Sequence, residues 1–177
     1  MAFSSNIKYK DLKLHIAYSI KESCYKPDAR IYNIANEVNH IETYTLEAGV
    51  EFPEGLSKII EKTIKSSVEV DCDMAVVVKG LMIGAFRASP AGAQESKVLI
   101  ETLIKELLTC VCKFKGDARK TVEGILAAMI IVAHEFKLNT QETMLLTREQ
   151  LLTSSQRLDP DFCEQVKSVL PNIEGIL

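Results

Sequence analysis

The sequence predicts an all-α protein, a single-domain bundle of about seven or eight helices spanning residues 1–177. Apolar residues recur at three- and four-residue intervals along almost the whole chain, which is the spacing of one helix face. The 177 residues include only 8 Gly and 5 Pro, so turn-forming residues are scarce and the connections should be short. With 47% apolar and 25% charged residues, the chain has the composition of a globular domain that buries a core.

Three helices are expected in the first third of the chain. The first has an apolar stripe that begins at Tyr9 and continues through Leu12 and Ile16. Pro27 and Pro53 can open the second and third helices, because proline is tolerated in the first helical turn. These helices should each pack one face on the core.

Residues 40–56 have the most irregular composition in the chain. A hinge could therefore lie there. It would separate an N-terminal helical hairpin over residues 6–48 from a main bundle over residues 54–170. The two parts would still form one all-α domain.

The core helices are predicted near residues 72–88, 93–115 and 118–137. The middle one has the clearest periodicity, with apolar residues at Ile100, Leu103, Ile104, Leu107, Leu108, Val111 and Phe114. Gly116 should end it, and Asp117 should cap its successor.

One segment within these core helices has a local preference for a strand. The β-branched residues 76–78 favour extended backbone. However, no turn signal follows them, and an isolated strand would leave its backbone groups unpaired, so a helix is predicted. Asp71 or Asp73 can cap this helix, and Ser89 followed by Pro90 can start the next one.

Two shorter helices should complete the bundle. Thr140 can cap a helix that runs to about Ser155. The Asp159–Pro160 pair then opens a last helix through Leu170, which Pro171 stops.

Small residues recur at four-residue spacing in two of the core helices, at Gly80 and Gly84 and again at Gly124 and Ala128. Glycine inside a helix costs about 1 kcal/mol relative to alanine, so its presence needs a structural reason. Residues four apart lie on one helix face, where small side chains allow close backbone approach. We therefore expect a tight crossing of these two helices.

Charge, cysteine content and hydropathy exclude several classes of function. A net charge of −3 without a dense basic patch argues against nucleic-acid binding. Five cysteines are an odd number without framework spacing, which indicates a reducing compartment. The longest apolar run, residues 125–133, is too short to span a membrane, and the N-terminus lacks a secretory signal, so we expect a cytoplasmic protein.

Few residues suggest chemistry. Glu37 and His40 have the Glu-x-x-His spacing of helical di-iron sites, but no second such motif occurs. A chance polar pair is therefore the preferred interpretation, with no cofactor and no tightly bound metal. Lys79, Arg87 and Glu123 adjoin the most apolar segments and should reach solvent or pair with one another, or else line a ligand cavity.

Three functions remain compatible with the sequence. The preferred one is a non-enzymatic helical interaction or regulatory protein, with a second copy of itself or an unidentified protein as partner. Tyr9, Tyr18 and Tyr25 support a symmetric dimer through the N-terminal helices, because tyrosine is enriched at interfaces. The alternatives are a small-ligand or metal-binding bundle centred on Glu37 and His40, either enzymatic or not, and a peripheral membrane-associated protein.

Overall fold

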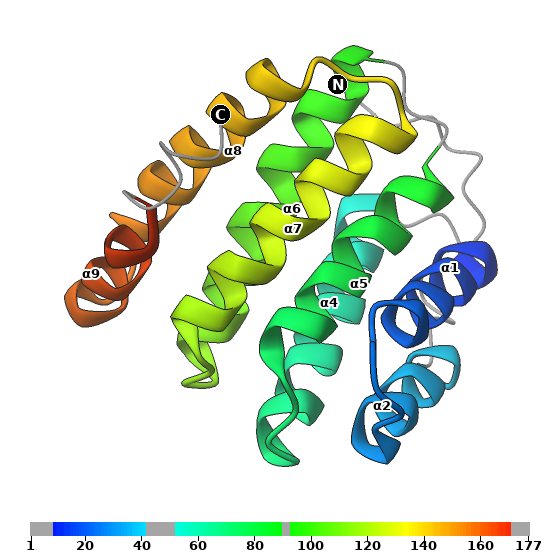
Figure 1. Ribbon diagram of the computed structural model, residues 1–177. Coiled ribbons are helices and arrows are strands. Elements are labelled where there is room, and N and C mark those ends of the chain that lie inside the picture. Colours follow the sequence, from blue (N-terminus) through cyan, green and yellow to red (C-terminus); the bar gives the residue numbers. More distant parts are fainter. Residues whose placement is uncertain (1–8, 42–51, 90–92, 171–177) are drawn as a thin grey trace.

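The computed structural model describes residues 9–41, 52–89 and 93–170 (Figure 1). Within these ranges it contains eight α-helices and no strand, which confirms the predicted all-α fold. The helices are α1 (Tyr9–Glu22), α2 (Ala29–Asn39), α4 (Phe52–Glu69), α5 (Met74–Ala88), α6 (Ala93–Lys113), α7 (Ala118–Glu135), α8 (Thr140–Ser155) and α9 (Pro160–Val169).

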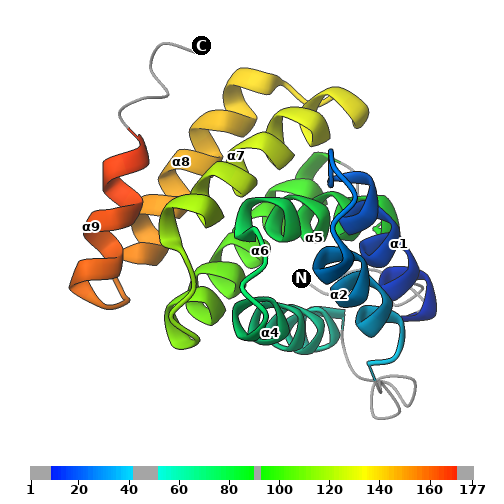
Figure 2. The ribbon, with the colours of Figure 1, turned by 60° about the horizontal axis from the view of Figure 1, so that its bottom comes forward.

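The helices form two rows. Contacts run from α1 through α5 and α7 to α9 in one row, and from α2 through α4 and α6 to α8 in the other. Figure 1 shows α1, α5 and α7 side by side, and Figure 2 brings α4 and α6 forward. Helix α5 contacts both α1 and α7 extensively, so it forms the centre of its row, whereas α1 lies at the edge of the molecule.

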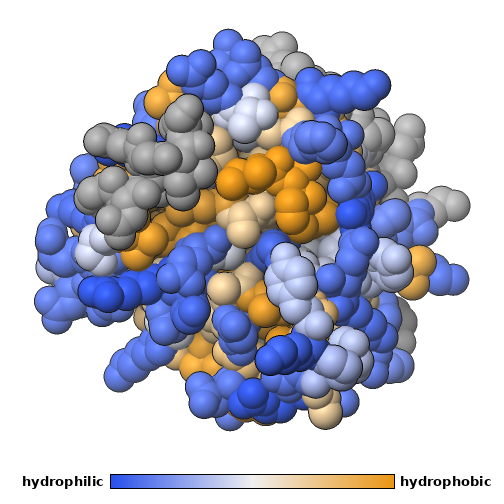
Figure 3. All heavy atoms as spheres, viewed as in Figure 1, coloured by the Kyte–Doolittle hydropathy of each residue, from blue (hydrophilic) through white to orange (hydrophobic). Residues whose placement is uncertain are grey.

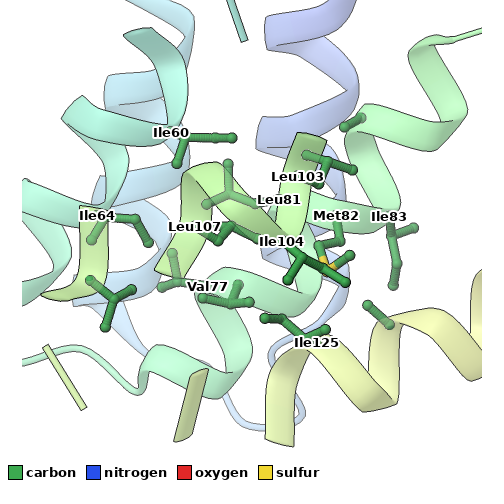
Figure 4. Packing of buried hydrophobic residues seen from close by; sticks show 14 of the residues in the cluster. Ile60, Ile64, Val77, Leu81, Met82, Ile83, Leu103, Ile104, Leu107 and Ile125 are labelled. Atoms are coloured by element: carbon green, nitrogen blue, oxygen red, sulfur yellow. The ribbon is translucent and has the colours of Figure 1, made fainter. Parts of the chain in front are cut away.

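The core lies between the two rows. The three predicted core helices are α5, α6 and α7, and side chains from α4 join them (Figure 4). The labelled residues that meet there are all buried: Ile60, Ile64, Val77, Leu81, Met82, Ile83, Leu103, Ile104, Leu107 and Ile125. In α4 and α6 these positions follow the spacing of one helix face. Helix α5 is instead buried on all sides from Val77 to Phe86, so periodicity does not single out one face of it.

The glycines of α5 lie at a close helix contact, but the expected partner is wrong. A Cβ atom on Gly80 would lie 2.6 Å from the backbone nitrogen of Ile20, and one on Gly84 would lie 2.7 Å from that of Ile16. Helix α1, and not α7, therefore packs directly on this glycine face. The spacing identifies a face that admits another backbone, but it carries no information about which helix supplies that backbone.

Gly124 serves a separate contact on the other side of α5. A Cβ atom at Gly124 would lie 3.0 Å from the Cα atom of Ala75. Ala128 is buried in the same helix. Helix α5 thus lies close to both of its neighbours in the row, but the contact with α7 uses the glycine of α7. Both glycines of the 15-residue α5 serve the contact with α1.

Aspartates are the N-cap residues of four of the described helices. Asp73, Asp117 and Asp159 each accept a hydrogen bond from a backbone N–H in the first helical turn, as predicted. Asp28 caps α2 in the same way, so the helix starts after Asp28 and not at Pro27. Asn139, one residue before Thr140, caps α8.

Two helix ends also differ from expectation. Ser89 is the C-cap of α5, because its N–H donates to the carbonyls of Ala85 and Phe86, and it does not start α6. At the end of α6, Lys115 takes the left-handed conformation with φ 57°. Gly116 follows it, and the Gly116 N–H donates to the carbonyl of Val111 at 2.9 Å.

Some predicted features lie outside the described residues. Pro90 and Pro171 do so, as does most of the predicted hinge over residues 40–56. The backbone of Pro53 lies in the first turn of α4, in agreement with its predicted place at the start of that helix.

Candidate functional site

Glu37 and His40, the predicted polar pair, lie on the surface of α2. His40 is the C-cap of α2, and both residues are exposed. They line a hollow of about 390 Å³ together with Lys62, Lys65 and Glu69 of α4. Lys65 pairs with Glu69 at 3.9 Å, and Lys62 adds a further positive charge beside the candidate ligands, so the hollow does not concentrate negative charge for a divalent cation.

The described residues contain no group of three or more His, Cys, Asp or Glu side chains that could hold a metal ion. All five cysteines are free thiols. Burial raises the pKa of Cys110 to about 11, so this thiol stays protonated at neutral pH and is a poor ligand or nucleophile. A second buried thiol, Cys72, has its pKa raised by the same cause.

The most connected charged group of the described chain is Arg87, near the end of α5. Its guanidinium forms a two-pronged ion pair with Glu135 of α7, with Nε–Oε1 2.8 Å and Nη2–Oε2 3.0 Å. It also pairs with Glu22 and donates to Ser19 Oγ at 3.3 Å, both on α1. One side chain therefore joins the three neighbouring helices of the first row.

The ion pairs around Arg87 change the acidity of their members. Hydrogen bonding to Arg87 holds the pKa of Glu135 below its ordinary value. The pKa of Arg87 is raised, chiefly by its hydrogen bonds to Glu135. Both groups therefore stay charged at neutral pH, which indicates a structural role for the ion pair more than a role in proton transfer.

We predict that Glu135→Gln lowers stability at neutral pH but not in acid. The pKa of Glu135 is lower in the folded state, so its contribution is present above the unfolded value, near 4.5, and disappears as pH falls through the folded value. The Glu135 side chain is 37% exposed, so the loss at pH 7 should be about 0.5–1 kcal/mol. Urea denaturation at pH 7 and pH 3 measures the difference, and an equal loss at both pH values would contradict it.

An open hollow of about 630 Å³ lies over the outer face of α1. Leu14, Tyr18 and Lys21 of α1 line it, and Arg87 and Glu135 form one side. Leu14 is 57% exposed and Tyr18 is 62% exposed, so two large side chains one helical turn apart lie together at the surface. The hollow therefore combines apolar side chains with charged groups held in fixed positions.

A second apolar surface lies on α7. Figure 3 shows apolar side chains gathered on the face of the molecule seen in Figure 1, with hydrophilic side chains around them. Helix α7 crosses this face and carries Ile130 and Ile131, which are 44% and 38% exposed.

Lys79 does not reach solvent as expected, and it does not pair with Glu123. Lys79 is only 9% exposed, and its ammonium lies over the ring of Tyr25, 4.7 Å from the centroid. Glu123 is exposed and pairs with Lys120 of its own helix. Neither residue lines the two hollows described above. Arg87 forms ion pairs with Glu22 and Glu135, and not with Lys79 or Glu123 as predicted, and it also borders the hollow over α1.

Sequence reasoning singled out Tyr18 and Tyr25 as possible interface residues of the N-terminal helices, but it missed Leu14 and the hollow beside it. Periodicity identifies the buried stripe of Leu12, Ile16 and Ile20, and beside it Tyr18 stands out only as an off-stripe aromatic residue. The signal that was available is Leu14, a large apolar residue on the face opposite to that stripe.

No protein-family model, curated protein or solved structure matches the chain. In the part of the chain that the structure describes, no helix has the length and apolar character needed to cross a membrane.

Proposed function

We propose that this chain is a non-enzymatic helical interaction protein that associates with a second copy of itself through the outer face of α1. The observation that supports this most directly is the exposure of Leu14 and Tyr18 beside the hollow of about 630 Å³. Exposed apolar side chains with a polar rim are typical of interaction sites. Tyrosine is favoured in such sites because it combines a large apolar ring with a polar tip.

The surrounding structure supports a rigid interface. Helix α1 is held by close backbone packing against Gly80 and Gly84 and by the ion pairs of Arg87. A partner would therefore meet a preorganised face and would not have to order it, which lowers the entropic cost of association. Helix α1 also lies at the edge of its row, where a second molecule has access.

We predict that the wild-type protein forms a dimer in the micromolar range and that Tyr18→Glu prevents this. Multi-angle light scattering over a concentration series should give a mass that rises above the monomer value of 19.7 kDa. The substituted carboxylate would lose its hydration in the interface, so the variant should remain a monomer. Leu14→Glu should have the same effect for the same reason.

Ile130→Glu provides the matched control. It places the same charge on an exposed isoleucine of the α7 surface, and the dimer should persist. A wild-type mass of 19.7 kDa at every concentration would reject self-association. Loss of the dimer in Ile130→Glu, but not in Tyr18→Glu, would move the interface to α7.

A further inference from the structure

The outer face of α1 has a second pattern beyond its exposed apolar residues. Asp11, Leu14, Tyr18, Lys21 and Tyr25 follow one another at intervals of three, four, three and four. This is the spacing of the contact positions in a two-helix coiled coil. All five residues are exposed, so together they form an uncovered stripe along the helix and into the turn that follows it.

The stripe is charged at both ends of its central apolar pair, with opposite signs. Asp11 precedes Leu14, and Lys21 follows Tyr18. Asp11 has no ion-pair partner among the described residues. Lys21 donates to the neutral Asn36 side chain at 2.7 Å, which leaves its charge uncompensated.

This arrangement distinguishes between the two ways in which two copies of α1 can pair. A parallel pairing would place each residue opposite its own counterpart, so that Asp11 faces Asp11 and Lys21 faces Lys21. Like charges directly opposite each other are unfavourable. A parallel arrangement is therefore disfavoured by the sequence of the stripe itself.

An antiparallel pairing instead places opposite charges facing each other. With the two-fold axis midway between Leu14 and Tyr18, Leu14 faces Tyr18 of the second copy, and Asp11 faces its Lys21. Two-fold symmetry repeats both contacts, which gives an apolar centre with an ion pair at each end. Such a self-complementary patch is what an isologous dimer requires.

We infer that two copies of this chain associate through an antiparallel contact of their α1 helices, with Asp11 of each copy opposite Lys21 of the other. This inference rests on the self-association proposed above and adds its geometry and register. Contacts between single helices are at the small end of protein interfaces, so the dimer should dissociate on dilution. The two ion pairs would set the register more than the affinity.

Charge exchange tests the register. Asp11→Lys and Lys21→Asp, each alone, put two like-charged pairs into the dimer and should raise its Kd at least about fivefold. The double variant Asp11→Lys/Lys21→Asp restores opposite charges and should return Kd to within about twofold of wild type. Sedimentation equilibrium at about 0.1 M salt, where surface charges are only partly screened, measures all four proteins.

Mixing and a charge control make the test sharper. The two single variants should associate with each other more tightly than either does with itself, because each supplies the charge that the other lacks. Glu149→Lys changes the net charge by the same amount as Asp11→Lys, but at an exposed position of α8, away from α1. This variant should leave Kd unchanged. Circular dichroism should show that all variants keep their helix content, since every substituted residue is exposed.

The outcomes separate this inference from the proposed function. If the wild type forms a dimer and both single variants match its Kd, the antiparallel register is wrong and self-association stands. If the single variants weaken the dimer but the double variant does not recover, the Asp11–Lys21 pairing is also wrong. If the wild type is a monomer throughout, the proposed function itself fails.

Discussion

Replacing Gly84 by alanine should destabilise the protein by about 3 kcal/mol or more. Overpacking usually costs about 1–3 kcal/mol, because neighbouring side chains can move aside. The Cβ atom that alanine adds at this position would instead meet backbone atoms of Ile16 and of His15. These atoms can move only if α1 shifts as a whole, so the loss should exceed the roughly 1 kcal/mol gained from the higher helix propensity of alanine.

Thermal and urea denaturation followed by circular dichroism measure this effect. Gly116→Ala is the matched control, because its Cβ atom would meet only side-chain atoms at 3.1 Å or more. We expect this control to change stability by less than about 1 kcal/mol. Equal melting temperatures for Gly84→Ala and wild type would show that α1 does not dock on the glycine face.

Replacing Leu107 by alanine should cost about 2–5 kcal/mol. Leu107 is fully buried in α6 at the centre of the core, together with Leu81 and Ile104 (Figure 4). The substitution removes buried apolar surface and leaves a cavity that helices packed on both sides cannot close. The expected loss is a large share of the total stability of a domain of this size.

Leu145→Ala is the control for this substitution. It removes the same atoms from α8, but Leu145 is 53% exposed, so stability should change by no more than about 0.5 kcal/mol. Urea titration of both variants gives the comparison. A loss at Leu107 no greater than that at Leu145 would contradict the assignment of α6 to the centre of the core.

Periodicity predicts the helices of this protein well, because each helix must bury one face wherever it packs. The predicted ranges near 93–115 and 118–137 correspond to α6 and α7 within two residues at each end. Helix starts are less well predicted when two capping candidates are adjacent. Asp28 follows Pro27, and its side chain accepts from the N–H of Arg30, so the cap decides the boundary.

Helix partners are harder to predict, since they depend on contacts between distant parts of the chain. Both α5 and α7 carry small residues at four-residue spacing, so the sequence predicts that the glycine face of α5 contacts α7. In the structure a close helix contact needs small residues on only one of the two helices, because the backbone of α1 at Ile16 and Ile20 lies against the glycine face of α5. The partners of Arg87 are equally invisible in the sequence, because Glu22 is 65 residues away and Glu135 is 48 residues away.

The packing of α1 on α5 also has a consequence for synthesis on the ribosome. Helix α1 ends at Glu22, whereas the groove that receives it is complete only at Ala88. At about 5–20 residues per second, the roughly 65 intervening residues take about 3–13 s to appear. During this interval the apolar stripe of α1 lacks the α5 surface that covers it in the folded protein, so the nascent chain exposes apolar surface that favours aggregation.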